Sequence, residues 1–559
     1  MSGHRVEGAG RFDPPRSPVV AVGLLVFLAV PLFFVKLGGA GLVDPDEPYY
    51  AVPALEMLKS GTWWIPVLHG QPWFDKPILF YWIVLGAFKT FGVSEWAARL
   101  GSALAGLGGA VAVATLSPRG WRRGGAHVLA AVILATSLEY AFLSRSAVTD
   151  MTLTLFLTLG FLAVARYLES GGLGAAAWGG AAFGLATLTK GPVGVLVPAV
   201  ALLGYGLSTR RRELLGPKAI AAAACGFAAT AVPWYAYMFA AHRELVVNVF
   251  LGKENLGRFV NPEHRQLPLF YAIVLAAGLL PWSVALPPAL LRAIRDLLHG
   301  ADRPGTSPGP VFALAWFAAV LGVFSLSASK LLTYILPAFP AAAFLIADYW
   351  CHALAPRPAG ERAPQGPLLV AWTGAAITIA IAAAILLFRR DGRFADSGSV
   401  LYGLAIALTA AAIAAVAAVR AGRLARFVGV QAAAAVAVVL VAVVVVVGSP
   451  GFEASSSTRT FVERLVAGGL ADQVAGAYQV HALSLDFYLG RTLVHENDAD
   501  GLAARVQKDP GRLWIVRSSD VDDIASHLPL RLERVATVSR CTAVRLSPGG
   551  SGTERKDGS

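Results

Sequence analysis

Long apolar stretches separated by short polar or basic segments recur along most of the chain. Many of them approach the roughly 20 residues that an α-helix needs to cross the hydrocarbon core of a bilayer. The pattern predicts a polytopic α-helical membrane protein with about 13 transmembrane helices. We expect these helices near residues 18–38, 96–116, 124–144, 150–168, 173–188, 191–207, 217–239, 268–293, 309–327, 331–349, 366–388, 400–419 and 427–448.

Two apolar stretches near the N-terminus need separate interpretations. The first, near 18–38, follows a basic tail (1–17) and has no convincing small-residue cleavage site, so we interpret it as a retained signal anchor. The stretch 77–92 is apolar but only about 16 residues long and contains Lys89. We expect it to lie along the outer membrane interface as an aromatic-rich, partly amphipathic helix.

The pattern changes after Pro450. Residues 450–548 alternate helical and strand-like patterns, and the segment "RLWIVRSS" is typical of a buried strand. We expect a small α/β domain there, followed by a disordered tail at 549–559. The transmembrane part divides into a first domain (18–349) that carries the outer loops and interfacial helices, and a group of C-terminal helices (350–449).

Composition agrees with a membrane protein and excludes other classes. The chain is 56% hydrophobic and 15% charged, with a mean hydropathy of +0.60, values far from those of a soluble domain. The net charge of +12 does not indicate nucleic-acid binding, because the basic residues cluster between apolar stretches, where they set orientation. The cysteines, Cys225, Cys351 and Cys541, have no paired spacing that indicates a disulfide framework or a metal site.

The basic loops predict the orientation. If the N-terminus is cytoplasmic, almost every basic loop lies inside, as the positive-inside rule requires. These loops contain Arg122 and Arg123, Arg166, Arg210 to Arg212, Arg292 and Arg295, Arg357 and Arg362, and Arg420 to Arg426. The segment "RRDGR" at 389–393 is basic on the other side. An odd number of crossings then places the C-terminal domain outside the cytoplasmic membrane, in the periplasm.

In this topology the segments that depart most from a lipid-facing composition all emerge on the outer side. They contain Asp44, Asp46, Glu47, Asp75, Lys76, Arg145, Asp150, Lys190, Arg258, His264, Lys330 and Tyr334. Charges at a membrane boundary are costly to bury and are usually functional where they converge. Lysine and arginine also extend to the interface at low cost, which is the structural alternative.

Several of these acids lie where a helix is expected to begin. In "DEPYYAVPALEMLKSG", Asp46 and Glu47 come at a helix start, where capping explains one acid and leaves another carboxylate available for chemistry. Asp150 opens an apolar span, so capping is again the alternative to a functional role. Arg145 is a candidate partner for Asp150.

The cations suit an anionic lipid group. Lys76 precedes Pro77 at headgroup height and suits a lipid phosphate, and an ion pair with Asp75 is the alternative. Lys330 and Tyr334, four residues apart on one face of an expected helix, can hold an anion together. These residue types fit transfer from a polyisoprenyl-phosphate sugar, because the leaving phosphate needs cations and the acceptor hydroxyl needs a carboxylate.

The motifs also resemble those of a known family. The segments "DPDEPYYAVPALEM", "WFDKPILFYW", "SRSAVTDM", "LTKGPVG", "ENLGRF" and "SKLLTYILPAFP" occur in the order seen in bacterial aminoarabinose (lipid A) transferases and their relatives. These relatives include the protein O-mannosyltransferases of the glycosyltransferase-C superfamily. The resemblance covers about residues 42–344. It implies a glycosyltransferase-C fold whose catalytic domain is 18–349, with a long first outer loop.

The resemblance also implies roles for particular residues. Asp46 and Asp150 match the family's catalytic or acceptor-orienting aspartates, with Glu47 as a further candidate beside Asp46. The implied ligands of the lipid phosphate are Lys76, Arg258 and Tyr334, with Lys330 and Lys190 as further candidates. A divalent metal is a possible cofactor: Asp75 matches one family ligand, but Asn255 stands where the family has a histidine, so His264 is the remaining candidate.

The sequence therefore predicts a glycosyltransferase of the bacterial inner membrane. It would transfer a sugar from an undecaprenyl-phosphate donor to lipid A or lipopolysaccharide, another envelope glycan, or a protein, on the periplasmic face. A protein O-mannosyltransferase proper is the alternative of the same chemistry. A transporter or a non-catalytic lipid-binding protein is the alternative of another class. In the C-terminal domain, His481, His495, Asp486 and Asp498 form no recognisable catalytic arrangement.

Overall fold

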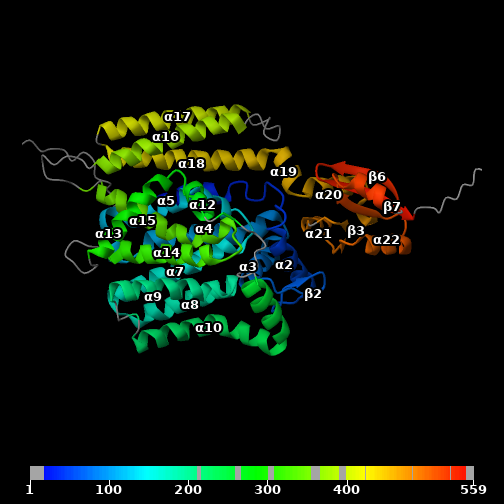
Figure 1. The fold of residues 1–559 in the computed structure, drawn as a ribbon, viewed down its shortest axis with the longest axis horizontal. Helices are drawn as coiled ribbons and strands as arrows, with labels where there is room; N and C mark the ends of the chain where they lie inside the picture. The colour runs from blue at the N-terminus through cyan, green and yellow to red at the C-terminus, as the bar shows by residue number, and fades with distance from the viewer. Residues whose placement is uncertain are drawn as a thin grey trace, which may run out of the picture.

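The structure is a computed structural model that places a bundle of long, roughly parallel helices beside a small sheet-containing domain at one end (Figure 1). It describes residues 18–210, 214, 216–257, 266–267, 269–299, 308–353, 355, 365–388, 398–421, 423–480, 482–528 and 530–548. The tails 1–17 and 549–559 and the basic segment 389–393 lie outside the described residues.

The bundle confirms the predicted polytopic α-helical class. Within the described ranges, 8 helical segments are long and apolar enough to cross a membrane; the number of about 13 crossings stays a prediction. The bundle helices are α1 (Pro18–Phe34), α4 (Glu95–Leu116), α5 (Ala126–Thr136), α6 (Leu138–Leu143), α7 (Thr149–Ser170), α8 (Leu173–Lys190), α9 (Val193–Thr209), α10 (Pro217–Ala241), α12 (Phe270–Gly278), α13 (Leu286–Leu298), α14 (Pro308–Leu326), α15 (Phe339–Ala353), α16 (Gln365–Phe388), α17 (Gly398–Arg420) and α18 (Leu424–Gly448).

Short helical turns connect several of these helices. They are η1 (Arg119–Trp121), η2 (Arg123–Gly125), η5 (Ser283–Ala285) and η6 (Leu332–Ala338), all of the 3-10 type, and η4 (Leu245–Gly257), a π-helix. The turn η6 leads directly into α15. Pro337 lies inside η6 and, because it has no amide hydrogen, cannot donate an α-helical hydrogen bond there.

Glycines let the backbones of α8 and α10 approach closely. A Cβ atom on Gly180 would lie 1.9 Å from the carbonyl oxygen of Ala223, and one on Gly226 would lie 2.0 Å from that of Ala177. Side-chain-free contacts of this kind drive helix association in a bilayer, where lipid tails are as apolar as the helices themselves. The two glycines are therefore required by the packing of α8 against α10.

The first outer loop folds into α2 (Pro48–Ser60), the strands β1 (Val67–Leu68) and β2 (Gln71–Pro72), and α3 (Leu79–Phe91). His69 and Gly70 connect the strands with φ angles of 53° and 72°, the left-handed geometry that two-residue hairpin turns use. The 13 residues of α3 extend about 20 Å, less than the roughly 30 Å of a hydrocarbon core. Its interfacial placement stays a prediction.

The C-terminal part contains the expected α/β region, which is confirmed. After α19 (Pro450–Ser456), α20 (Arg459–Ala467) and η8 (Ala471–Gln473), a sheet forms in the order β4-β3-β5-β7-β6. Strands β3–β4 and β3–β5 are parallel, and β5–β7 and β6–β7 are antiparallel. The elements are β3 (Val474–Tyr478), α21 (Ser484–Leu489), β4 (Val494–Glu496), α22 (Ala499–Lys508), β5 (Leu513–Arg517), α23 (Val521–His527), β6 (Leu530–Val538) and β7 (Cys541–Pro548).

The C-terminal domain docks on the first outer loop, and Figure 1 shows α2 and β2 at the bundle end that faces α21. The carboxylate of Asp44 accepts the backbone N–H of Ser484 at 3.1 Å and pairs with the guanidinium of Arg540. The hydroxyl of Tyr488 accepts the backbone N–H of Leu42 at 2.7 Å. The outer loop and the domain are thus joined by polar contacts at Leu42 and Asp44, just before Asp46 in the chain.

Candidate active site

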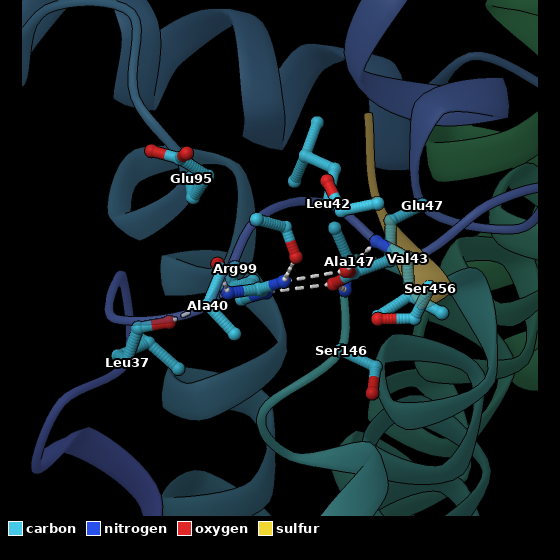
Figure 2. A network of polar contacts seen from close by, with 12 residues as sticks. Leu37, Ala40, Leu42, Val43, Glu47, Glu95, Arg99, Ser146, Ala147 and Ser456 are labelled. Atoms are coloured by element: carbon cyan, nitrogen blue, oxygen red, sulfur yellow. Dashed lines mark hydrogen bonds and ion pairs between the residues drawn. The ribbon is translucent and has the colours of Figure 1, made fainter. Parts of the chain in front are cut away.

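A buried ion pair fixes the start of the outer loop. Arg99 of α4 donates from Nε to Glu47 Oε1 at 2.8 Å and from a terminal nitrogen to Oε2 at 2.6 Å, and Figure 2 shows the two side chains pointing toward each other. Their side chains are only 6% and 3% exposed. The same carboxylate accepts the backbone N–H groups of Val43 and Ala147 at 2.8 Å each. Both carboxylate oxygens of Glu47 therefore already accept hydrogen bonds within the protein.

The guanidinium of Arg99 is equally occupied. It donates to the carbonyl oxygens of Leu37, Ala40 and Gly41 at 2.7–2.9 Å. The pair thus ties the segment that precedes α2 to α4 and, through the amide of Ala147, to the residues that precede α7. Sequence reasoning missed Arg99, although an arginine inside an otherwise apolar span was an available signal.

Glu47 also departs from the expected capping role. It is the N-cap residue of α2, yet its side chain makes no cap hydrogen bond. By contrast Asp46, one residue earlier, is exposed. Since Glu47 is committed to Arg99, Asp46 is the carboxylate of this pair that reaches solvent.

A second buried ion pair joins two neighbouring bundle helices. Lys190 Nζ, in the last turn of α8, lies 2.5 Å from Asp150 Oδ1, in the first turn of α7. The positions suit the helix dipoles, since an acid lies at an N-terminus and a base at a C-terminus. The ammonium of Lys190 also lies over the ring of Tyr334, 4.4 Å from its centroid. Three sequence-predicted residues are therefore in direct contact.

Arg145 is not the partner of Asp150, and that expectation was wrong. Its guanidinium donates to the carbonyl oxygens of Leu32 and Val35 at 3.0 Å and 2.7 Å. These carbonyls belong to the C-terminal end of α1, where they have no partner within the helix. Lys190 takes the place beside Asp150 instead.

Tyr50 of α2 lies among the acids. Its ring packs against Phe80 at 5.2 Å and Tyr81 at 5.9 Å between centroids. Loss of solvation raises the pKa of Tyr50 well above its usual value, and the charges of Asp75, Asp150 and Asp46 raise it further. The negative charges of the three carboxylates thus favour the neutral form of the Tyr50 phenol. Tyr50 was also missed from the sequence, although it stands in the motif "DEPYY".

Lys76 lies beside these acids. Its Nζ is 2.8 Å from Asp75 Oδ2, with both side chains largely buried at 12% and 14% exposure. The pairing that was the structural alternative for Lys76 therefore exists. It does not remove Lys76 from the site, because Asp75 also acts on Tyr50.

Lys330 differs from the expected helical placement. Its Nζ donates to the carbonyl oxygen of Ser327 at 2.8 Å, and the residue precedes η6, which begins at Leu332. Lys330 and Tyr334 thus do not share an α-helical face, and that expectation was wrong because the segment forms a 3-10 turn. Arg258 and His264 lie outside the described residues.

A metal at Asp75 and His264 stays a prediction, because His264 lies outside the described residues. In the part of the chain that the structure describes, one group of His, Cys, Asp or Glu has at least three ligand atoms within 4.8 Å of one another, namely His69, Asp486 and His495. Asp75 is paired with Lys76 instead.

Comparisons with known proteins agree with this architecture. Residues 20–247 match the family described as dolichyl-phosphate-mannose-protein mannosyltransferase. The crystal structure of ArnT from Cupriavidus metallidurans bound to undecaprenyl phosphate aligns with a TM-score of 0.74 and 23% identity, over 94% of this chain and 98% of that chain. The chain has the glycosyltransferase-C fold. Because the alignment covers nearly the whole chain, this glycosyltransferase-C fold includes the C-terminal domain.

Sequence relatives confirm the resemblance that the motifs indicated. An undecaprenyl phosphate-alpha-4-amino-4-deoxy-L-arabinose arabinosyl transferase of Serratia proteamaculans (strain 568) is 31% identical over 59% of this chain and 59% of that protein. An uncharacterized protein of Aquifex aeolicus (strain VF5) is 32% identical over 58% of this chain and 63% of that protein. The chain thus matches about three-fifths of the length of these curated relatives.

Proposed function

We propose that this protein is a glycosyltransferase that moves a sugar from a polyisoprenyl phosphate, undecaprenyl phosphate in bacteria, to an envelope acceptor. The observation that carries the proposal is the grouping of Asp46, Asp75 and Asp150 around Tyr50, with Lys76 and Lys190 paired to two of these acids. Acids and cations at one end of a membrane bundle suit a reaction that deprotonates a hydroxyl and releases a lipid phosphate.

The roles follow from exposure and pairing. Asp46, which is exposed, orients the acceptor hydroxyl and takes its proton. The acceptor oxygen bonds to the anomeric carbon while the bond from that carbon to the phosphate oxygen breaks, and the polyisoprenyl phosphate leaves with the electron pair. Lys190 and Lys76 stabilise the departing phosphate. Asp150 orients Lys190, and Tyr334 supplies a neutral donor beside it.

Other predicted residues have supporting roles in this proposal. Glu47 positions the loop that carries Asp46, because its carboxylate is committed to Arg99. Arg258 and Lys330 are further ligands of the lipid phosphate. The domain boundaries, with a catalytic domain at 18–349 and an α/β domain at 450–548, belong to the same proposal. So do the inner-membrane location and the periplasmic active site, which rest on the positive-inside rule.

The test is transfer by the purified protein with Asp46→Asn. We expect turnover to fall by about 10²–10⁴-fold, the usual contribution of a general base, while donor-lipid binding stays at the wild-type level. Asp472→Asn, which alters an exposed acid on the C-terminal domain, serves as the control and should retain full activity. Wild-type turnover by the Asp46 variant would contradict the proposal.

A second acceptor class is favoured by one observation, the match of residues 20–247 to the protein mannosyltransferase family. If the protein is a protein O-mannosyltransferase, it glycosylates a Ser/Thr peptide with a polyisoprenyl-phosphate mannose donor. If it modifies lipid A, it transfers aminoarabinose to that lipid instead. Parallel assays with the two donor and acceptor pairs separate these possibilities, and lipid transport without any transfer product would favour a transporter.

A further inference from the structure

A cluster of metal-ligating side chains lies where the C-terminal domain meets the first outer loop. His69 comes from the β1–β2 turn, Asp486 from α21 and His495 from β4. Asp486 Oδ2 lies 2.7 Å from His495 Nε2 and 3.8 Å from His69 Nε2. The imidazole rings are nearly parallel, at 14° with centroids 5.0 Å apart. Segments far apart in the sequence thus bring two imidazoles and one carboxylate together.

His69 has an unsatisfied nitrogen in this cluster. Its Nε2 is buried and has no hydrogen-bond partner, although the side chain as a whole is 32% exposed. A buried polar atom without a partner is costly and calls for an explanation such as an ion. A cation among the three side chains would satisfy it.

Hydrogen bonds outside the cluster orient its members. Asp486 Oδ1 accepts the backbone N–H of Leu493 at 2.6 Å, which leaves Oδ2 directed at the imidazoles. Glu56 of α2 accepts the backbone N–H groups of His69 and Gly70 at 2.9 Å and 3.1 Å and so holds the turn in place. Supports of this kind are what fix the ligands of metal sites.

We propose that His69, Asp486 and His495 bind a zinc ion that joins the first outer loop to the C-terminal domain. Two imidazoles and a carboxylate are ligands that zinc accepts, and water would complete a tetrahedral shell. Ligands of tetrahedral zinc lie roughly 3.3 Å apart. Binding therefore opens the 2.7 Å contact and shortens the 3.8 Å separation by about half an ångström each.

The cluster is separate from the candidate active site. The site is distinct from the Asp75 position, which lies beside Lys76. It is also independent of the proposed transfer reaction, because none of its three residues lies among the acids around Tyr50.

The experiment is zinc binding by the purified full-length protein in detergent after removal of metals by a chelator. Isothermal titration with Zn²⁺ and elemental analysis should give one equivalent per chain that is lost in His69→Asn and in His495→Gln. Asn at position 69 tolerates the left-handed backbone of that turn. Zn²⁺ should raise the thermal unfolding midpoint of the wild type and leave those of the two variants unchanged.

His527→Gln is the matched control, since His527 pairs with Asp523 at 2.9 Å on the same domain but both side chains are about three-quarters exposed. It should bind zinc as the wild type does. The proposal is overturned if the metal-stripped wild type binds no zinc, or if His69→Asn and His495→Gln retain the full equivalent. Loss of that equivalent in Asp75→Asn alone would place the metal elsewhere and also overturn it. If a variant is poorly folded, loss of the visible absorption of bound Co²⁺ in the other variant decides the question.

Discussion

Replacement of Arg99 by methionine tests whether the buried ion pair holds the outer loop. Methionine keeps much of the side-chain volume but removes the charge and every donor. Glu47 would retain the backbone N–H groups of Val43 and Ala147 but would lose its counter-charge. We therefore expect Arg99→Met to lower the free energy of unfolding and to reduce transfer activity.

The magnitude follows from what is left unpaired. Removing one partner of a buried ion pair costs about 3–5 kcal/mol, and the carbonyls of Leu37, Ala40 and Gly41 also lose their donor. A cavity of about 120 Å³ borders both side chains, so water can solvate some of these groups. We expect a net loss of about 4–5 kcal/mol.

The assay is reversible unfolding of the purified protein in mixed micelles, applied to a double-mutant cycle. Arg99→Met and Glu47→Leu should each lower the free energy of unfolding. The loss in the double variant should be smaller than the sum of the two single losses by about 2–3 kcal/mol. Arg122→Met is the control: this arginine lies between η1 and η2, beyond the C-terminal end of α4, and donates to the carbonyl oxygens of Ser117 and Thr115 at 2.9 Å and 2.7 Å. The Arg122→Met change should lower the free energy of unfolding by no more than about 1 kcal/mol.

Two results would refute this reasoning. Additive effects in the cycle would mean that the two side chains do not stabilise each other. If Glu47→Gln abolished transfer without changing the free energy of unfolding, Glu47 would act in the chemistry itself rather than in positioning the loop.

Two further predictions concern packing. Gly180→Ala should destabilise the packing of α8 against α10 by several kcal/mol, because the new Cβ would meet a facing carbonyl oxygen at 1.9 Å. Gly174→Ala on α8 is the control: its Cβ would meet nothing within 4 Å, so it should be neutral or stabilising. Thermal unfolding compares the two variants. Arg540→Ala should weaken the docking of the C-terminal domain on the outer loop by about 1–3 kcal/mol, because the buried carboxylate of Asp44 loses its cation. Faster proteolysis between α18 and the sheet would report this, and Arg534→Ala, whose acidic partner is 90% exposed, should behave as the wild type.

The contrast between Asp46 and Glu47 marks the limit of what the motif allowed. The sequence predicted a helix start with more acids than capping requires, and α2 does begin at Pro48. The helix pattern left open which acid serves chemistry, and only the family resemblance favoured Asp46, because the choice depends on which carboxylate meets a cation from another helix. Arg99 lies 52 residues away in the chain, so only the packing of α4 against the loop distinguishes the two acids.

By itself, the sequence determined the class of the protein, the positions of most of its apolar helices and the buried strand β5, although the single helices expected at 124–144, 268–293 and 331–349 are each broken into shorter elements. These features depend on local composition and periodicity, because a bilayer demands long apolar helices and a sheet core demands apolar strands. Tertiary structure alone decided the partners: Lys190 for Asp150, 40 residues apart, and His69 for Asp486 and His495. Such pairs form where distant segments pack together, and nothing in the local pattern of either segment specifies the other.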